Sequence, residues 1–148
     1  MLIPILKKLF LRDLEKLKTE LGIYQSEQNI WLIDKQIVNT AGNLCLHLIG
    51  NLNTYIGAEL GKTGYIRNRP LEFSSGPVPR AELLKRIDET SRMIAATFDQ
   101  LNDEQMAEEY PQEVSGGKVS TGYFLTHLAT HLAYHLGQIN YHRRLLDN

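Results

Sequence analysis

The sequence has few of the residues that mark several common classes of protein. It contains a single cysteine, Cys45, among 148 residues. One cysteine excludes a disulfide within the chain and a zinc module built from cysteines. The 16 Lys and Arg residues and 17 Asp and Glu residues give a formal net charge of -1. Nucleic-acid binding normally needs excess positive charge to displace counterions from phosphate, so we expect no nucleic-acid partner.

Long hydrophobic runs are also absent. No stretch reaches the roughly 18 consecutive apolar residues of a membrane-spanning helix, so we expect no membrane partner. The opening segment MLIPILKKLFLRDLEKLK carries charges from Lys7 onward and lacks the uninterrupted apolar region of a signal peptide. We therefore expect a cytoplasmic protein. The length and the 43% of hydrophobic residues fit a single domain spanning residues 1–148.

Apolar residues recur at helical spacing in the first half of the chain. The first such segment begins at Leu2 and stops at Gly22, which predicts an amphipathic helix. A second helix is expected to begin after Asn39 or Thr40, both of which are good N-cap residues. It should continue to about Leu60, just before Gly61.

The second half of the chain predicts two more long helices. One starts near Pro79, and the other starts at Ser120 or Thr121 and runs nearly to the C-terminus. Gly and Pro crowd residues 61–79, which predicts a long crossover loop of the kind that often covers a functional site. Asn102 should cap a short helix, and residues 113–119 should form a hairpin that turns at Gly116–Gly117. The sequence therefore predicts an all-α four-helix bundle with a long crossover between helices 2 and 3.

Histidine is distributed unevenly, because four of the five histidines lie in the predicted last helix. His127, His131 and His135 are four residues apart, so each lies about 40° around the helix from the last and all project from one face. Two adjacent histidines can bind one metal ion through their imidazole nitrogens. The outer two are roughly 12 Å apart along the helix, so all three can scarcely share one ion. Spacing leaves open which adjacent pair binds.

His47 is the only histidine outside the last helix, and it lies in the middle of the second. Together with two histidines of a facing helix it would form a three-imidazole site with positions open for water or substrate, as catalytic metals require. Imidazole discriminates weakly among zinc, nickel, iron and manganese, so each is a candidate. The alternative is a set of hydrogen-bonded core histidines that bind no metal.

The segment from His131 to Ile139, HLAYHLGQI, resembles the HxxxHxGQ signature that closes the last helix of the DinB-like superfamily. His47 within LCLHLIGNL and the crossover segment RNRPLEF, residues 67–73, match further parts of the pattern in the same order. The resemblance covers nearly the whole chain. It implies an up-down-down-up four-helix bundle, commonly dimeric, with a divalent metal bound by His47, His131 and His135. His127 would then be a neighbour of the site.

The same resemblance implies a class of reaction. Members of this superfamily with assigned activities are often metal-dependent S-transferases that use low-molecular-weight thiols, or related isomerases. We therefore expect a metal-dependent enzyme, either a thiol S-transferase acting on small electrophiles or a related hydrolase or isomerase. The alternative is a non-catalytic homodimer in which the metal joins the second and fourth helices and the bundle binds a small molecule or a partner.

Several residues near the predicted ligands are candidates for supporting roles. Gln138, three residues after His135, and Asn51, one turn after His47, could hydrogen-bond the ligand imidazoles. Cys45 lies about 200° around the helix from His47, so it should point away from the site and fill the core.

The crossover and the last helix contain further polar candidates. Arg67, Arg69 and Glu72 could line the mouth of a pocket and bind an anionic thiol, or pair with one another on the surface. Tyr134 could reach a substrate or pack in the core or an interface. His142 should lie at the helix end, where a cation suits the helix dipole.

Overall fold

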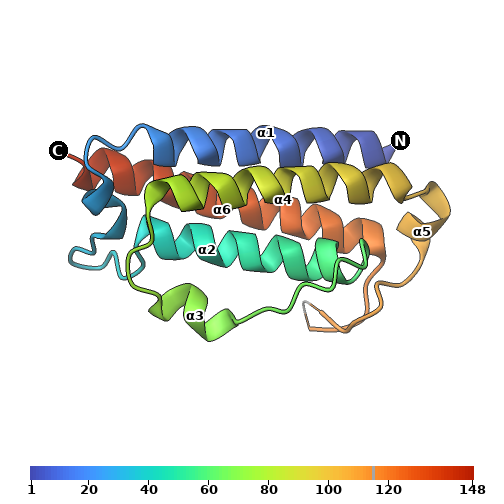
Figure 1. Ribbon diagram of the computed structural model, residues 1–148. Helices are drawn as coiled ribbons and strands as arrows, with labels where there is room; N and C mark the ends of the chain where they lie inside the picture. Colours follow the sequence, from blue (N-terminus) through green and yellow to red (C-terminus); the bar gives the residue numbers. More distant parts are fainter. Residues whose placement is uncertain (115) are drawn as a thin grey trace.

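The computed structural model describes residues 1–114 and 116–148, and it confirms the all-α prediction: within these ranges extended structure is limited to isolated bridges. Four long helices lie side by side (Figure 1): α1 (Leu2–Gly22), α2 (Ala41–Leu52), α4 (Arg80–Gln100) and α6 (Thr121–Leu146). A 3-10 turn (Glu27–Trp31) precedes α2, and a π-helical segment (Asn53–Ala58) extends it. None of the described helices has the length and apolar character needed to cross a membrane.

The four helices share one core. Helix α1 packs against α4 and α6, and α2 packs against the same two helices. Phe10 of α1 and Phe98 of α4 meet with ring centroids 5.7 Å apart, and both side chains are buried. Burying a large apolar side chain contributes about 1.5–3 kcal/mol, so this shared core holds the helices in a defined register.

Local capping accounts for where three helices begin. The side chains of Thr40, Asn102 and Ser120 each accept a hydrogen bond from the backbone N–H three residues on, at 2.9, 2.9 and 3.1 Å. Each bond satisfies a donor that the first turn of a helix leaves free. The predicted starts of α2, of the short helix α5 (Asp103–Ala107) and of α6 are therefore confirmed.

The crossover differs from the prediction, because part of residues 61–79 is helical. The short helix α3 (Arg69–Ser74) begins after Asn68, whose side chain accepts a hydrogen bond from the backbone N–H of Leu71 at 3.3 Å. Pro70 lies in its first turn, where a missing N–H costs nothing. The prediction of a continuous loop is wrong because six residues are too few to show an apolar period.

Asn43 is one of the buried side chains that attach helix α3 to α2. The Asn43 amide donates to the backbone carbonyls of Glu72 and Ser75 at 2.9 and 3.1 Å. These are carbonyls that the end of a helix leaves without an internal partner. The contact joins residues about 30 positions apart in the chain and places α3 beside the first half of α2 (Figure 1).

The predicted hairpin over residues 113–119 is reduced to a bridge. Val114 and Gly117 form an antiparallel pair with two hydrogen bonds of 2.9 and 3.0 Å. Gly117 therefore belongs to the paired part and not to the turn, contrary to the expectation of a turn at Gly116–Gly117. Ser115 lies outside the described residues.

His142 is buried, contrary to the expectation of a cation at the end of the helix. Its side chain is only 3% exposed. Nε2 donates to the carbonyl of Leu32 at 2.8 Å, and Nδ1 accepts from the Tyr24 hydroxyl at 2.7 Å. Burial lowers the pKa of His142, so the ring is neutral in the folded protein.

We predict that acidification will destabilise the wild type more steeply than a His142→Gln variant. Unfolded histidine binds a proton below about pH 6.5, whereas the folded ring, whose pKa is lowered by burial, binds one only at lower pH. Stability is therefore lost as the pH falls through the unfolded pKa towards the folded one, at up to about 1.4 kcal/mol per pH unit for one proton.

Urea unfolding between pH 7.5 and 5 measures both slopes. The glutamine side chain of the variant can still donate to Leu32 but does not titrate. The free energy of unfolding of the His142→Gln variant should therefore fall less steeply with decreasing pH, by an amount equivalent to the uptake of up to one proton. Identical slopes would contradict a neutral buried His142.

Candidate metal centre

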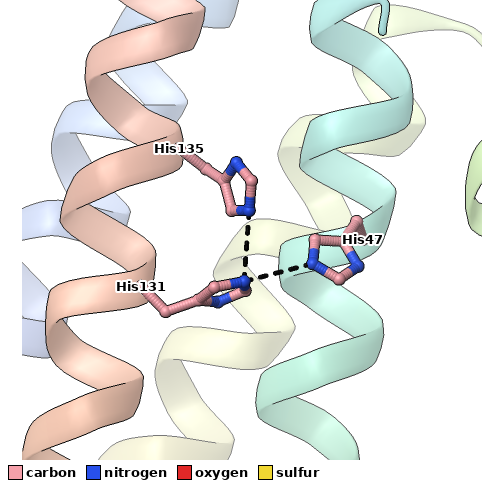
Figure 2. Close-up of side chains that lie close together, drawn as sticks. All are labelled: His47, His131 and His135. Atoms are coloured by element: carbon pink, nitrogen blue, oxygen red, sulfur yellow. Dashed lines mark hydrogen bonds between the residues drawn. The ribbon is translucent and has the colours of Figure 1, made fainter.

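The three predicted metal ligands come together between two helices. His47 projects from α2, and His131 and His135 project from α6 towards it (Figure 2). The Nε2 atom of His131 lies 3.2 Å from Nε2 of His47 and 3.1 Å from Nε2 of His135. One ligand atom from each ring lies within 4.8 Å of the other two, so the group could hold a metal ion.

Two of the rings have a hydrogen-bond acceptor behind them. Nδ1 of His47 donates to Oε1 of Glu72 at 3.1 Å, and Nδ1 of His135 donates to Oε1 of Gln138 at 2.6 Å. A neutral imidazole carries one proton, so a proton on Nδ1 leaves a lone pair on Nε2. Both rings therefore direct a lone pair towards His131. The structure thus contains the hydrogen bond that the sequence suggested between Gln138 and His135.

His131 cannot donate a hydrogen bond to both neighbouring rings. A single proton on its Nε2 can be donated to one of the two neighbouring lone pairs but not to both. Its Nδ1 atom is buried and has no hydrogen-bond partner within the described residues. Burial, followed by repulsion from His135 and His47, lowers the pKa of His131 to about 4, so a second proton does not resolve the conflict at neutral pH.

The two contacts of His131 have the spacing expected of nitrogens that share a divalent cation. With ligands at 2.0–2.1 Å, the nitrogens would be about 2.9 Å apart around an octahedral ion and about 3.3 Å apart around a tetrahedral one. The two observed contacts of 3.1 and 3.2 Å fall between these values. The donor set therefore suits a metal, because one ion would engage all three lone pairs at once.

A cavity of about 610 Å³ lies beside His47 and His131. Its wall includes four residues that sequence reasoning proposed for the site: Asn51, Arg67, Arg69 and His127. His127 is exposed and stacks on Phe124, with ring centroids 6.0 Å apart, so it lines the cavity and does not join the cluster.

Asn51 does not support the ligand as predicted. No hydrogen bond joins it to His47 within the described residues, because Nδ1 of His47 faces Glu72 and Nε2 faces His131. Asn51 is 8% exposed, and its Oδ1 atom is buried without a partner. It is a polar side chain of the cavity wall.

The two arginines of the crossover differ in their partners. Arg67 donates to both oxygens of Glu72, from Nε at 2.8 Å and from Nη2 at 2.9 Å. Of the two roles considered for these residues, Arg67 therefore has both: it pairs with Glu72 of the crossover, and its side chain also lines the cavity. Among the ion pairs of the described residues Arg69 has no carboxylate partner, and it too lines the cavity.

Glu72 is the residue whose contact with the site was not foreseen. The prediction placed it at a pocket mouth or in a surface pair, whereas it is buried and accepts a hydrogen bond from His47. The capping signal of Asn68 with Pro70 could have located α3, but nothing local indicates where that helix docks.

Two side chains near the histidines stay outside the centre. Cys45 is fully buried, as predicted for a residue that fills the core. Burial raises the pKa of its thiol to about 12. Tyr134 is exposed, and its ring centroid lies 5.3 Å from that of His135.

Comparison with known proteins supports the family resemblance and the fold. A family model described as the DinB superfamily matches residues 30–139. No match is found among curated proteins. Among solved structures, the crystal structure of the conserved protein of a locus from Enterococcus faecalis is similar, with a TM-score of 0.76. The match covers 97% of this chain and 95% of the Enterococcus faecalis chain, with 16% sequence identity. At this level of identity the likeness shows the fold alone.

Proposed function

Because this chain belongs to the DinB superfamily, we propose that it is a metal-dependent enzyme that transfers a low-molecular-weight thiol to a small electrophile. The observation that carries the proposal is the convergence of three imidazole nitrogens beside a cavity of about 610 Å³. A purely structural site would not need a cavity next to its ligands.

The ligands in this proposal are His47, His131 and His135, and the ion is zinc, nickel, iron or manganese. When bound, such an ion would lower the pKa of a coordinated thiol and supply a thiolate at neutral pH. The three imidazoles are neutral ligands, so they would leave the charge of the ion undiminished. A hydrolase or isomerase would use the same ligands.

The cavity wall supports an anionic thiol as the co-substrate. Arg69 has no carboxylate partner among the described ion pairs and can bind a carboxylate of the ligand. Arg67 adds positive charge, although its guanidinium is engaged by Glu72. Asn51 offers an amide within the same wall.

A non-catalytic bundle is the second candidate. The three ligands come from α2 and α6, which already pack against each other, so an ion there would join two helices of the core. In this alternative the cavity binds a small molecule or a partner without reaction.

We also propose that residues 1–148 form one domain with the up-down-down-up helix order. The course of the chain through α1, α2, α4 and α6 in Figure 1 supports this order. The cytoplasmic location stays a prediction from the sequence.

We further propose that two copies of the chain form a homodimer through the exposed face of α6. No Asp, Glu, Lys or Arg occurs between residues 121 and 142, although this helix has an exposed face. That face includes Tyr123, Thr130, Ala133, Tyr134, Gly137 and Tyr141. The centres of protein interfaces are poor in charge and rich in Tyr. A Cβ at Gly137 would meet nothing within 4 Å, so a second helix can approach closely there.

We predict that alanine at any one of the three ligand positions will remove the bound metal. Untagged wild type should contain about one ion per chain by elemental analysis, and the His47→Ala, His131→Ala and His135→Ala variants should contain little. His127→Ala is the matched control, because it removes an α6 histidine outside the cluster. Equal loss in the control, or a metal-free wild type, would count against the centre.

We predict that the metal-loaded wild type will conjugate an anionic thiol to a model electrophile, and that His131→Ala will abolish this. Arg69→Ala should raise the KM for the anionic thiol about 10- to 150-fold, since a charge-assisted hydrogen bond contributes about 1.5–3 kcal/mol. The KM for an uncharged thiol should not change. Conjugation that survives loss of the metal would favour the non-catalytic bundle.

We predict that Gly137→Glu will convert a dimer into a monomer, because it places a charge in the centre of the exposed α6 face. Glu has the higher helix propensity, so unfolding is not the expected cause. Ala81→Glu, on the exposed side of α4, is the control. Light scattering during gel filtration measures the mass, and an unchanged mass in Gly137→Glu excludes this face as the interface.

A further inference from the structure

We propose that Glu72 is a positioning residue of the metal centre, and that its carboxylate, seated against Gly50 and neutralised by Arg67, sets the tautomer of His47. The inference rests on the proposed metal-dependent function. It goes beyond that function by assigning the affinity of the centre partly to the crossover helix α3, which supplies no ligand.

The Glu72 carboxylate is held entirely by donors of this chain. It is 6% exposed and accepts from Nδ1 of His47 at 3.1 Å, from Nε of Arg67 at 2.8 Å and from Nη2 of Arg67 at 2.9 Å. A buried carboxylate costs several kcal/mol unless it is paired and hydrogen-bonded. Arg67 supplies that pairing and leaves one lobe of Oε1 for His47.

The neighbours of His47 decide which nitrogen carries its proton. Nδ1 faces both the acceptor Oε1 of Glu72 at 3.1 Å and the donor Nη2 of Arg67 at 3.5 Å. With the carboxylate present, Nδ1–H is favoured and the Nε2 lone pair points at the cluster. Without the carboxylate, Arg67 would donate to Nδ1, and the proton would move to Nε2, where the ion binds.

Gly50 makes room for this contact. It lies three residues after His47 in α2, and a Cβ built there would overlap the Glu72 carboxyl group. Any larger residue at position 50 would therefore displace the carboxylate while leaving all three ligand histidines intact. The C-terminal end of α3 is fixed by Asn43, which donates to the backbone carbonyls of Glu72 and Ser75.

The first experiment compares two glycine variants of the same helix. Gly50→Ala removes the seat of the carboxylate, whereas Gly42→Ala places its Cβ against the ring of Trp31 at the far end of α2. Both are expected to fold less stably. Only Gly50→Ala should weaken binding of zinc, measured against a chelator, and by about 10–100-fold. Equal zinc affinity in the wild type and Gly50→Ala would overturn the proposal.

The second experiment introduces no steric overlap. Glu72→Gln keeps a neutral acceptor and should weaken zinc binding less than Glu72→Ala. Adding Arg67→Ala to Glu72→Ala removes the competing donor and should restore part of the affinity. A double variant that binds no better than Glu72→Ala would contradict the role given to Arg67.

The decisive measurement is the tautomer of His47 in metal-free protein, from the nitrogen-15 chemical shifts of the ring at pH 8. The wild type should carry Nδ1–H, and Glu72→Ala should shift to Nε2–H. A Glu72 that merely stabilises the fold would leave the tautomer unchanged, and that result would overturn the proposal. If the wild type binds no metal, the proposed function fails, while the tautomer still decides the role of Glu72.

Discussion

The constraint on which the site depends is the packing of one buried and two half-buried imidazoles with their Nε2 atoms directed at one point. His47 and His135 each donate through Nδ1 to an acceptor of the chain, so neither can donate to His131. Buried polar atoms without partners are costly. A cation between the rings would convert this repulsion into attraction, and for that reason the same arrangement is poor as a core and good as a metal site.

The rest of the fold supplies the rigidity that this arrangement needs. His131 and His135 are about one turn apart on α6, so the spacing of their backbone positions is set by helix geometry. The position of His47 depends on how α2 packs on α6, and hence on a core built by all four long helices. Capping by Thr40 and Ser120 defines where these two helices begin, and it therefore contributes to the register of the ligands.

What the sequence predicts well is local, and what it misses is long-range. Helix starts at Thr40 and Ser120, and the shared face of the α6 histidines, follow from residues within one or two turns. The choice of His131 and His135 over His127 needed the family resemblance, because both pairs have the same spacing. Helix α3 and the burial of His142 depend on contacts with residues far away in the chain, such as Asn43 and Tyr24, and no local pattern encodes them.

The attachment of α3 has a consequence for access to the cavity. Arg67 and Arg69 line the cavity wall and lie on the same crossover that carries Glu72. A movement of this segment that widened the cavity would also withdraw the carboxylate from His47. The width of the cavity and the orientation of the His47 ring are therefore coupled through a single segment of the chain, so neither can change without the other.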